Sequence, residues 1–118
     1  MAEDIRVLLV EPMAKPRLVT VEHTLENLQK LVDGYIQAVY PWEDNIALVC
    51  DEEALYKDSE WNRYICEGLA IKGTFFICGI EGEDFADIPL DLAEKYMQLL
   101  YTPQVFVRTP SGVIVLDI

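Results

Sequence analysis

The sequence predicts a single α+β domain, residues 1–118, with a mostly antiparallel or mixed sheet, two helices packed on one face and a C-terminal β-hairpin. Three observations lead to this fold class. Segments with strand character outnumber helical segments, and hairpin connections outnumber connections that would suit a parallel crossover. Two segments carry apolar residues at helical spacing. The chain is 52% hydrophobic, so a core can form without disulfides or metals.

Strand character recurs along the whole chain. Some segments alternate apolar and polar residues, which is typical of half-buried strands, and others are almost continuously apolar, which indicates burial on both faces. Residues 5–11 belong to the second kind. The expected strands lie at residues 5–11, 17–22, 35–41, 45–51 and 73–80, with two more in the C-terminal segments QVFVR and VIVLDI. The intervening TPSG predicts a hairpin turn between the last two.

Two segments predict helices. In the first, Thr24 is the expected N-cap, leucines recur at helical spacing, and Gly34 provides the left-handed stop. In the second, residues 89–101, Pro89 suits the first helical position, and an apolar stripe follows. Both helices should therefore present one apolar face to the sheet.

Three segments are less regular. Residues 52–63 carry mixed signals and are expected to form a loop or a short turn. Residues 62–71 suit either a short helix or an edge strand, and the two alternatives stay open. Residues 81–88 predict an acidic loop.

The negative charge is concentrated in two segments. The chain has a net charge of −12. Residues 43–60 hold seven acids and one lysine, and residues 81–94 hold six acids and no base, so each segment contributes −6. Because binding to phosphates needs clustered Lys and Arg, direct nucleic-acid binding is disfavoured. A basic protein partner fits this charge distribution better.

The cysteines and the apolar runs indicate the compartment. The three cysteines are an odd number, two of them lie in apolar runs, and His23 is the single histidine. We therefore expect no disulfide framework, no metal site and no cofactor, in a reducing cytoplasm. No apolar run approaches the roughly 20 residues of a membrane span, and the N-terminus has acids where a signal peptide needs bases. No membrane contact is expected.

Clustered carboxylates are the first candidates for chemistry. Glu43 and Asp44 are candidates for a general acid–base pair, and Asp51, Glu52 and Glu53 are candidates for oxygen ligands of a divalent cation. Adjacent side chains on an extended chain point to opposite sides, however, so neighbouring carboxylates rarely converge. A hairpin turn and a solvated strand end are the favoured interpretations. No catalytic residue is assigned.

A second candidate site follows the irregular segment. Arg63 is one of few bases near the first acidic segment, and an internal ion pair with Asp51 or Glu53 is the favoured interpretation. Alternatively, its guanidinium binds a carboxylate or phosphate of a ligand, with Trp61 as an aromatic platform. The candidates for ligand or partner binding are Tyr40, Trp42, Glu43, Asp44, Asp51, Glu52, Glu53, Trp61, Asn62 and Arg63.

Several motifs together resemble an uncharacterised domain family. They are VLLVEP near the start, the block LENLQKLVDGYIQAVYPWEDNIALVCDEEA, then WNR and IKGTFFICG, and the similarity covers about residues 5–101. Members of the family that the sequence resembles occur in phages, plasmids and conjugative elements of Gram-positive gut bacteria, and they have no established activity. The resemblance implies a mobile-element accessory protein in a bacterial cytosol.

The sequence has no recognisable catalytic constellation, and its negative charge is localised. Together with the resemblance, these two features predict a function. We expect a non-enzymatic acidic interaction protein that binds a basic host protein, as a DNA mimic or a counter-defence protein. One alternative is a domain that binds or sequesters a nucleotide-type small ligand near Trp61, Asn62 and Arg63. The other is a small enzyme that uses the clustered carboxylates.

The C-terminal hairpin needs a neighbour. Residues 104–118 lie outside the similarity, and both faces of the last strand are largely apolar. An isolated two-stranded hairpin is marginally stable in water, and a solvated edge with two apolar faces is a liability. Burial within the monomer is the favoured arrangement, and a homodimer through the hairpin is the alternative.

Overall fold

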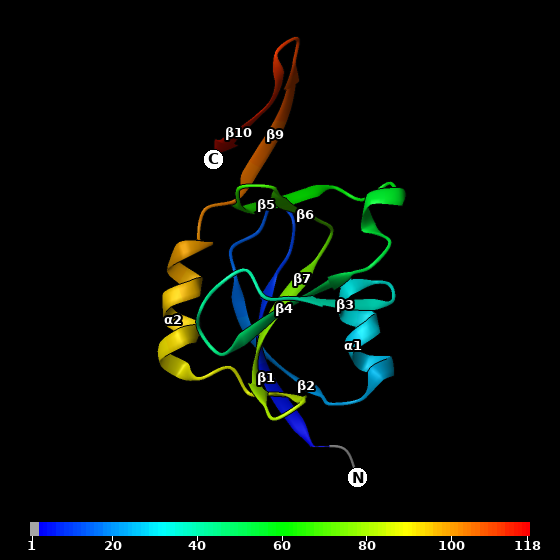
Figure 1. Ribbon diagram of the computed structural model, residues 1–118, viewed down its shortest axis with the longest axis vertical. Coiled ribbons are helices and arrows are strands. Elements are labelled where there is room, and N and C mark those ends of the chain that lie inside the picture. The colour runs from blue at the N-terminus through cyan, green and yellow to red at the C-terminus, as the bar shows by residue number, and fades with distance from the viewer. Residues whose placement is uncertain (1–2) are drawn as a thin grey trace.

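Figure 1 shows the computed structural model, which describes residues 3–118. This range holds two α-helices, a single 3-10 turn and ten strands. The strands are β1 (Asp4–Val10), β2 (Arg17–Glu22), β3 (Ile36–Val39), β4 (Ile46–Asp51), β5 (Trp61–Cys66), β6 (Leu69–Lys72), β7 (Phe75–Glu81), β8 (Asp84–Ala86), β9 (Gln104–Thr109) and β10 (Gly112–Asp117). The helices are α1 (Leu25–Val32) and α2 (Leu90–Leu99), and the 3-10 turn is η1 (Ala54–Tyr56).

The central sheet has six antiparallel strands. Its order is β2-β1-β7-β4-β3, and the short β8 pairs with β7. The α+β class, the antiparallel sheet and the C-terminal hairpin are confirmed. Strands β1, β7 and β4 lie in the middle of the sheet, and nearly all of their residues are buried. This explains their continuous apolar runs, because a central strand covered on both faces has no solvent-facing side.

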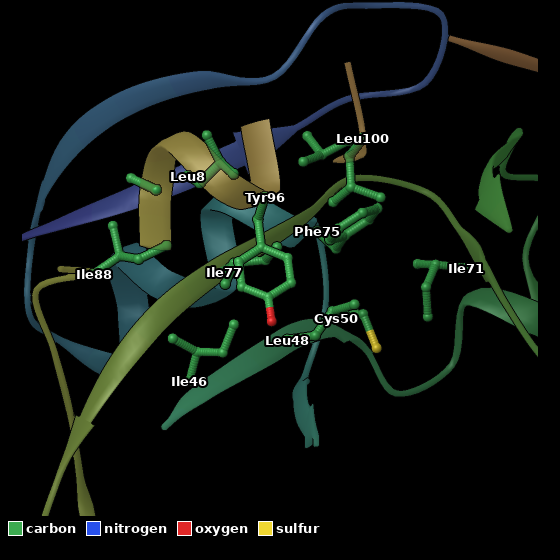
Figure 2. Packing of buried hydrophobic residues seen from close by; sticks show 12 residues of the cluster. Leu8, Ile46, Leu48, Cys50, Ile71, Phe75, Ile77, Ile88, Tyr96 and Leu100 are labelled. Atoms are coloured by element: carbon green, nitrogen blue, oxygen red, sulfur yellow. The ribbon is translucent and has the colours of Figure 1, made fainter. Parts of the chain in front are cut away.

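The prediction that both helices pack on one face is wrong, because each face of the sheet has its own helix (Figure 1). Successive residues of β1 alternate: Leu8 joins the core under α2, and Leu9 joins the core under α1. Figure 2 shows the α2 side, where Tyr96 packs among strand residues. A sheet whose central strands are apolar on both faces must be covered on both.

The first helix begins and ends at identifiable residues. Thr24 is its N-cap, as predicted, and its side chain accepts a hydrogen bond from the amide of Asn27 at 3.2 Å. The left-handed residue at the end of the helix is Asp33, with φ 57°, and the prediction that Gly34 has this role is wrong. Asp is one of the few non-glycine types that adopt this conformation readily.

Two segments with weak sequence signals are also strands. Within residues 62–71, the alternative of a helix is wrong, because the chain forms the antiparallel hairpin β5–β6 above the main sheet (Figure 1). Residues 84–86 of the expected acidic loop pair with the end of β7. The expected turn in 52–63 is present as η1.

The C-terminal hairpin, residues 104–118, projects from the rest of the molecule and is called the arm (Figure 1). Neither buried cluster of the core contains a residue of the arm. Ile114 is 47% exposed and Leu116 49% exposed, although both are aliphatic. The expected burial within the monomer is therefore wrong, and the last strand is paired only with β9 in the part of the chain that the structure describes.

Candidate functional site

Arg63 is buried where three parts of the chain meet. Its Nε donates to the Leu100 carbonyl after α2 at 3.1 Å, and its Nη2 donates to the Ala14 carbonyl in the β1–β2 turn at 2.5 Å. Its Nη1 donates to Oδ1 of Asn62 at 2.9 Å. Burial lowers the pKa of Arg63 below its ordinary value. The expected ion pair with an acid of residues 51–53 is wrong, because the hydrogen-bond partners are oxygens of uncharged groups.

Asn62 completes this polar junction. Its Nδ2 donates to the carbonyl of Val10 and to the carbonyl of Gly73, each at 2.9 Å. Both Asn62 and Arg63 are essentially inaccessible to solvent. Because buried donors are costly to leave unpaired, their hydrogen bonds hold the β5–β6 hairpin to the main sheet. The two residues are part of the framework rather than ligand-facing groups.

Trp61 attaches the arm to the β5–β6 hairpin. Its ring stacks on Phe106 of the arm, with 5.4 Å between ring centroids. Nζ of Lys72 lies 5.6 Å from the centroid of the same ring. Trp61 is 40% exposed, but its ring already has these internal partners. An aromatic platform combined with a free guanidinium, as a nucleotide site would need, is therefore not assembled at residues 61–63.

The loop with Glu43 and Asp44 is anchored to α2. Trp42 packs on Tyr96 with 4.5 Å between ring centroids. Oδ2 of Asp44 accepts hydrogen bonds from Nζ of Lys95 at 2.7 Å and from the Tyr96 hydroxyl at 2.6 Å. These two bonds, the lysine first, hold the pKa of Asp44 below its usual value. Glu43 is exposed, and the Asp44 carboxylate is bonded to Lys95 and Tyr96, which does not suit the expected acid–base pair.

Asp51 is the last residue of β4, and its carboxylate bonds to the turn that follows. Its Oδ2 lies 2.7 Å from Nζ of Lys57, and its Oδ1 accepts a hydrogen bond from the amide of Glu53 at 2.9 Å. Asp51 is buried, whereas Glu52 and Glu53 are exposed. The bond to Asp51 raises the pKa of Lys57. Asp51 therefore fixes the turn after β4.

The acidic candidates are not brought together. Glu43 and Asp44 precede β4, and Asp51 and Glu52 lie at its far end, so the two pairs are about 20 Å apart along a six-residue strand. Tyr40 follows β3 and is 63% exposed. These residues form no common pocket around Arg63, which is the arrangement that a carboxylate enzyme would need.

A different group of acids does converge, at the end of the sheet away from the arm. There the start of β1, the end of β7 and the strand β8 surround a hollow of about 340 Å³. It is called the acidic hollow, and its ionisable residues are Glu3, Asp4, His23, Glu81, Asp84 and Asp87. The imidazole Nε2 of His23 lies 3.7 Å from Oδ1 of Asp84. The backbone amide of Arg6 donates a hydrogen bond to the carboxylate oxygen Oδ1 of Asp87 at 2.7 Å, which holds one wall in place.

Sequence reasoning missed the acidic hollow. Its walls come from the first and the seventh and eighth strands, which are about 80 residues apart in the chain. The signal was present in part, because acids flank the outer end of both β1 and β7. Only the antiparallel pairing of β1 with β7 and of β7 with β8 brings these strand ends to the same end of the sheet.

Two features of the described residues bear on a metal site and on a membrane span. Between residues 3 and 118, no group of three or more His, Cys, Asp and Glu side chains is placed to hold a metal ion. Within the same range, no helix has the length and apolar character needed to cross a membrane.

Comparison with known proteins identifies the family. A family model described as domain of unknown function (DUF3846) matches residues 5–101. The chain belongs to this family. The family match covers the sheet, both helices and the acidic hollow except Glu3 and Asp4, and it ends before the arm. No curated protein and no solved structure matches the chain.

Proposed function

We propose that this DUF3846 protein is a non-enzymatic interaction domain that binds a basic protein through the acidic hollow. The observation that supports the proposal is the convergence of five carboxylates on one concave surface. A hollow lined by one sign of charge focuses its field and attracts the opposite charge. A lysine- or arginine-rich segment is the chemical complement of this surface.

The second acidic segment supplies most of this surface. Glu81, Asp84 and Asp87 line the hollow, and Asp4 of β1 and Glu3 just before it add to them. The first segment is divided, because Glu43 and Asp44 precede β4 and residues 51–60 lie at or beyond its far end. A DNA-like strip along both segments is therefore less well supported than a local site for a basic segment.

The remaining candidates support a non-catalytic role. The polar groups of Arg63 and Asn62 are already hydrogen-bonded within the fold. Asp44 and Asp51 each hold a loop in place. The three cysteines are free, which fits a reducing cytoplasm. An accessory role in a mobile element rests on the motif resemblance described above, and the proposed partner is then a basic protein of the host.

A labelled oligolysine peptide tests the acidic hollow. We expect it to bind the full chain, and fluorescence anisotropy should show an affinity that falls steeply with salt. The variant Glu81→Gln/Asp84→Asn removes two charges from the hollow and should weaken binding several-fold. Both side chains are exposed, so the fold should be kept.

A matched control separates the hollow from net charge. Glu52→Gln/Glu53→Gln removes the same two charges from exposed positions at the other end of β4. It should leave the peptide affinity nearly unchanged. Equal losses in the two variants would mean that the peptide responds to total charge only, and the hollow would then not be the binding site.

A further inference from the structure

The arm differs from the rest of the molecule in charge and exposure. Residues 104–118 carry one base, Arg108, and one acid, Asp117, so they are neutral in a chain of net charge −12. Val113 is 58% exposed and Ile118 is 59% exposed. An apolar, neutral extension does not complement the basic partner proposed for the acidic hollow. Its exposed apolar surface therefore indicates a separate binding partner.

One edge of the arm is open. β9 lies against β5. Oε1 of Gln104 in β9 accepts a hydrogen bond from the backbone amide of Tyr64 at 2.7 Å, and the ring of Phe106 stacks on Trp61. In residues 3–118, β10 pairs with β9 alone. Its outer edge therefore presents unpaired backbone donors and acceptors, which is a template for another strand.

An apolar groove adjoins β10. It has a volume of about 240 Å³ and is lined by Trp61, Tyr64, Ala70, Phe106, Val113 and Val115. Val113 and Val115 lie on the same face of β10, since side chains two apart in a strand point the same way. A strand added beside β10 would project its own alternate side chains toward this groove.

The charges of the arm indicate which chain would supply the strand added beside β10. Arg108 pairs with Val113 near the tip, and Asp117 pairs with Gln104 at the base. Because Val113 and Asp117 are four residues apart in one strand, the two charges lie on the same face at opposite ends. Within the chain, Oδ1 of Asp117 accepts a hydrogen bond from Nε2 of Gln104 at 3.0 Å. In an antiparallel neighbour of β10 the tip lies beside the base, so Arg108 on β9 and the aspartate of the other chain share one face, about 10 Å apart across Val113.

We propose that the arm is a dimerisation element in which β10 pairs antiparallel with β10 of a second copy of this chain. The arrangement has two-fold symmetry, so the same contacts form twice. This pairing satisfies the open edge of β10 and places valines from the partner at the apolar groove. It also brings Arg108 of each chain toward Asp117 of the other. It leaves the face with Ile114 and Leu116 exposed. The proposal concerns the arm alone and does not depend on the acidic hollow.

Charge reversal tests the antiparallel arrangement in the full chain. Sedimentation equilibrium at low salt should show a concentration-dependent dimer for the native sequence. Arg108→Asp alone and Asp117→Arg alone each turn two exposed attractive pairs into repulsive ones, so each should raise the dimer Kd about tenfold. The double variant restores the opposite charges, and its Kd should return to within about twofold of the native value.

Cysteine cross-linking gives a second measurement that does not depend on charge. In a Cys66→Ser background, Val115→Cys lies near the middle of β10, and Ser111→Cys lies at the tip. Antiparallel pairing brings the two strand centres together and keeps the two tips apart, so the mid-strand variant should oxidise to a covalent dimer and the tip variant should not.

Three results would overturn the proposal. The first is a native chain that stays monomeric at every concentration, which would assign the arm to a different protein. The second is a double charge variant that dimerises no better than the single variants. The third is cross-linking at the tip as well as at the middle, because two parallel arms would bring both positions close to their copies.

Discussion

The carboxylate of Asp51 occupies the space in which a side chain at Gly34 would lie. A Cβ atom on Gly34 would come within 2.7 Å of Oδ2 of Asp51, closer than real Cβ contacts are found. Gly34 does not have a positive φ, and Asp33 provides the left-handed turn instead. Glycine is therefore needed here for the close approach of the chain after α1 to the end of β4.

Gly34→Ala should lower the free energy of unfolding by about 1–3 kcal/mol, because the added methyl group must displace a buried carboxylate. Urea unfolding monitored by tryptophan fluorescence measures the change. The control is the same substitution in an Asp51→Ala background, where the space is free and the cost should largely disappear. An undiminished cost in that background would place the strain elsewhere.

Arg63→Lys should destabilise the domain by at least about 3 kcal/mol, because one ammonium group cannot reach the oxygens of Leu100, Ala14 and Asn62 together. Chemical denaturation is again the measurement. Arg17→Lys is the matched control, since Arg17 makes an exposed ion pair with Glu11 and should change stability by less than about 0.5 kcal/mol. Similar effects of the two substitutions would contradict the framework role of Arg63.

The contribution of Asp44 should depend on pH. Its pKa is lower in the folded chain than the ordinary value of 3.8, so its bonds stabilise the fold above that value and this stabilisation is lost as the pH falls through the folded pKa. Asp44→Asn should therefore lower the denaturation midpoint at neutral pH, and the difference from the native chain should shrink as the pH falls below 3.8 and through the lower pKa of the folded chain. Tyr96→Phe in both backgrounds tests whether the hydroxyl carries part of the effect. A pH-independent difference would contradict the assignment.

The three thiols should differ in reactivity. Burial, with a smaller contribution from Asp51, raises the pKa of Cys50 to about 11, and burial raises the pKa of Cys78 to about 12. Cys66 is exposed. Because the thiolate is the reactive form, a disulfide reagent near neutral pH should modify Cys66 rapidly and the other two only on unfolding. Cys66→Ser should remove the fast phase, and a fast phase that persists would show that a buried thiol opens locally.

Deletion of residues 104–118 should leave a folded domain. The buried clusters on both faces of the sheet are built without the arm, and the family match ends at residue 101. Loss of the Trp61–Phe106 contact should cost stability modestly. Circular dichroism and the urea midpoint measure the outcome, and an unfolded or aggregated product would show that the arm is part of the core.

Local patterns in the sequence determined most of the secondary structure. Apolar continuity identified the central strands, and the Thr24 cap and leucine spacing identified α1. These features depend on neighbours within a few residues, so periodicity and capping chemistry report them directly. The same pattern already indicated that residues 5–11 are buried on two faces, which requires a helix on each side.

The tertiary structure alone decided the partners of the candidate residues. Arg63 and Asp51 are close in sequence, but their buried positions give Arg63 carbonyl partners and give Asp51 the ammonium of Lys57. The acidic hollow depends on strand order, because its acids lie about 80 residues apart and meet only through the pairing of β1, β7 and β8. The exposure of the arm was likewise undetermined, since an apolar strand can be buried by its own chain or by another, and its pattern is the same in both.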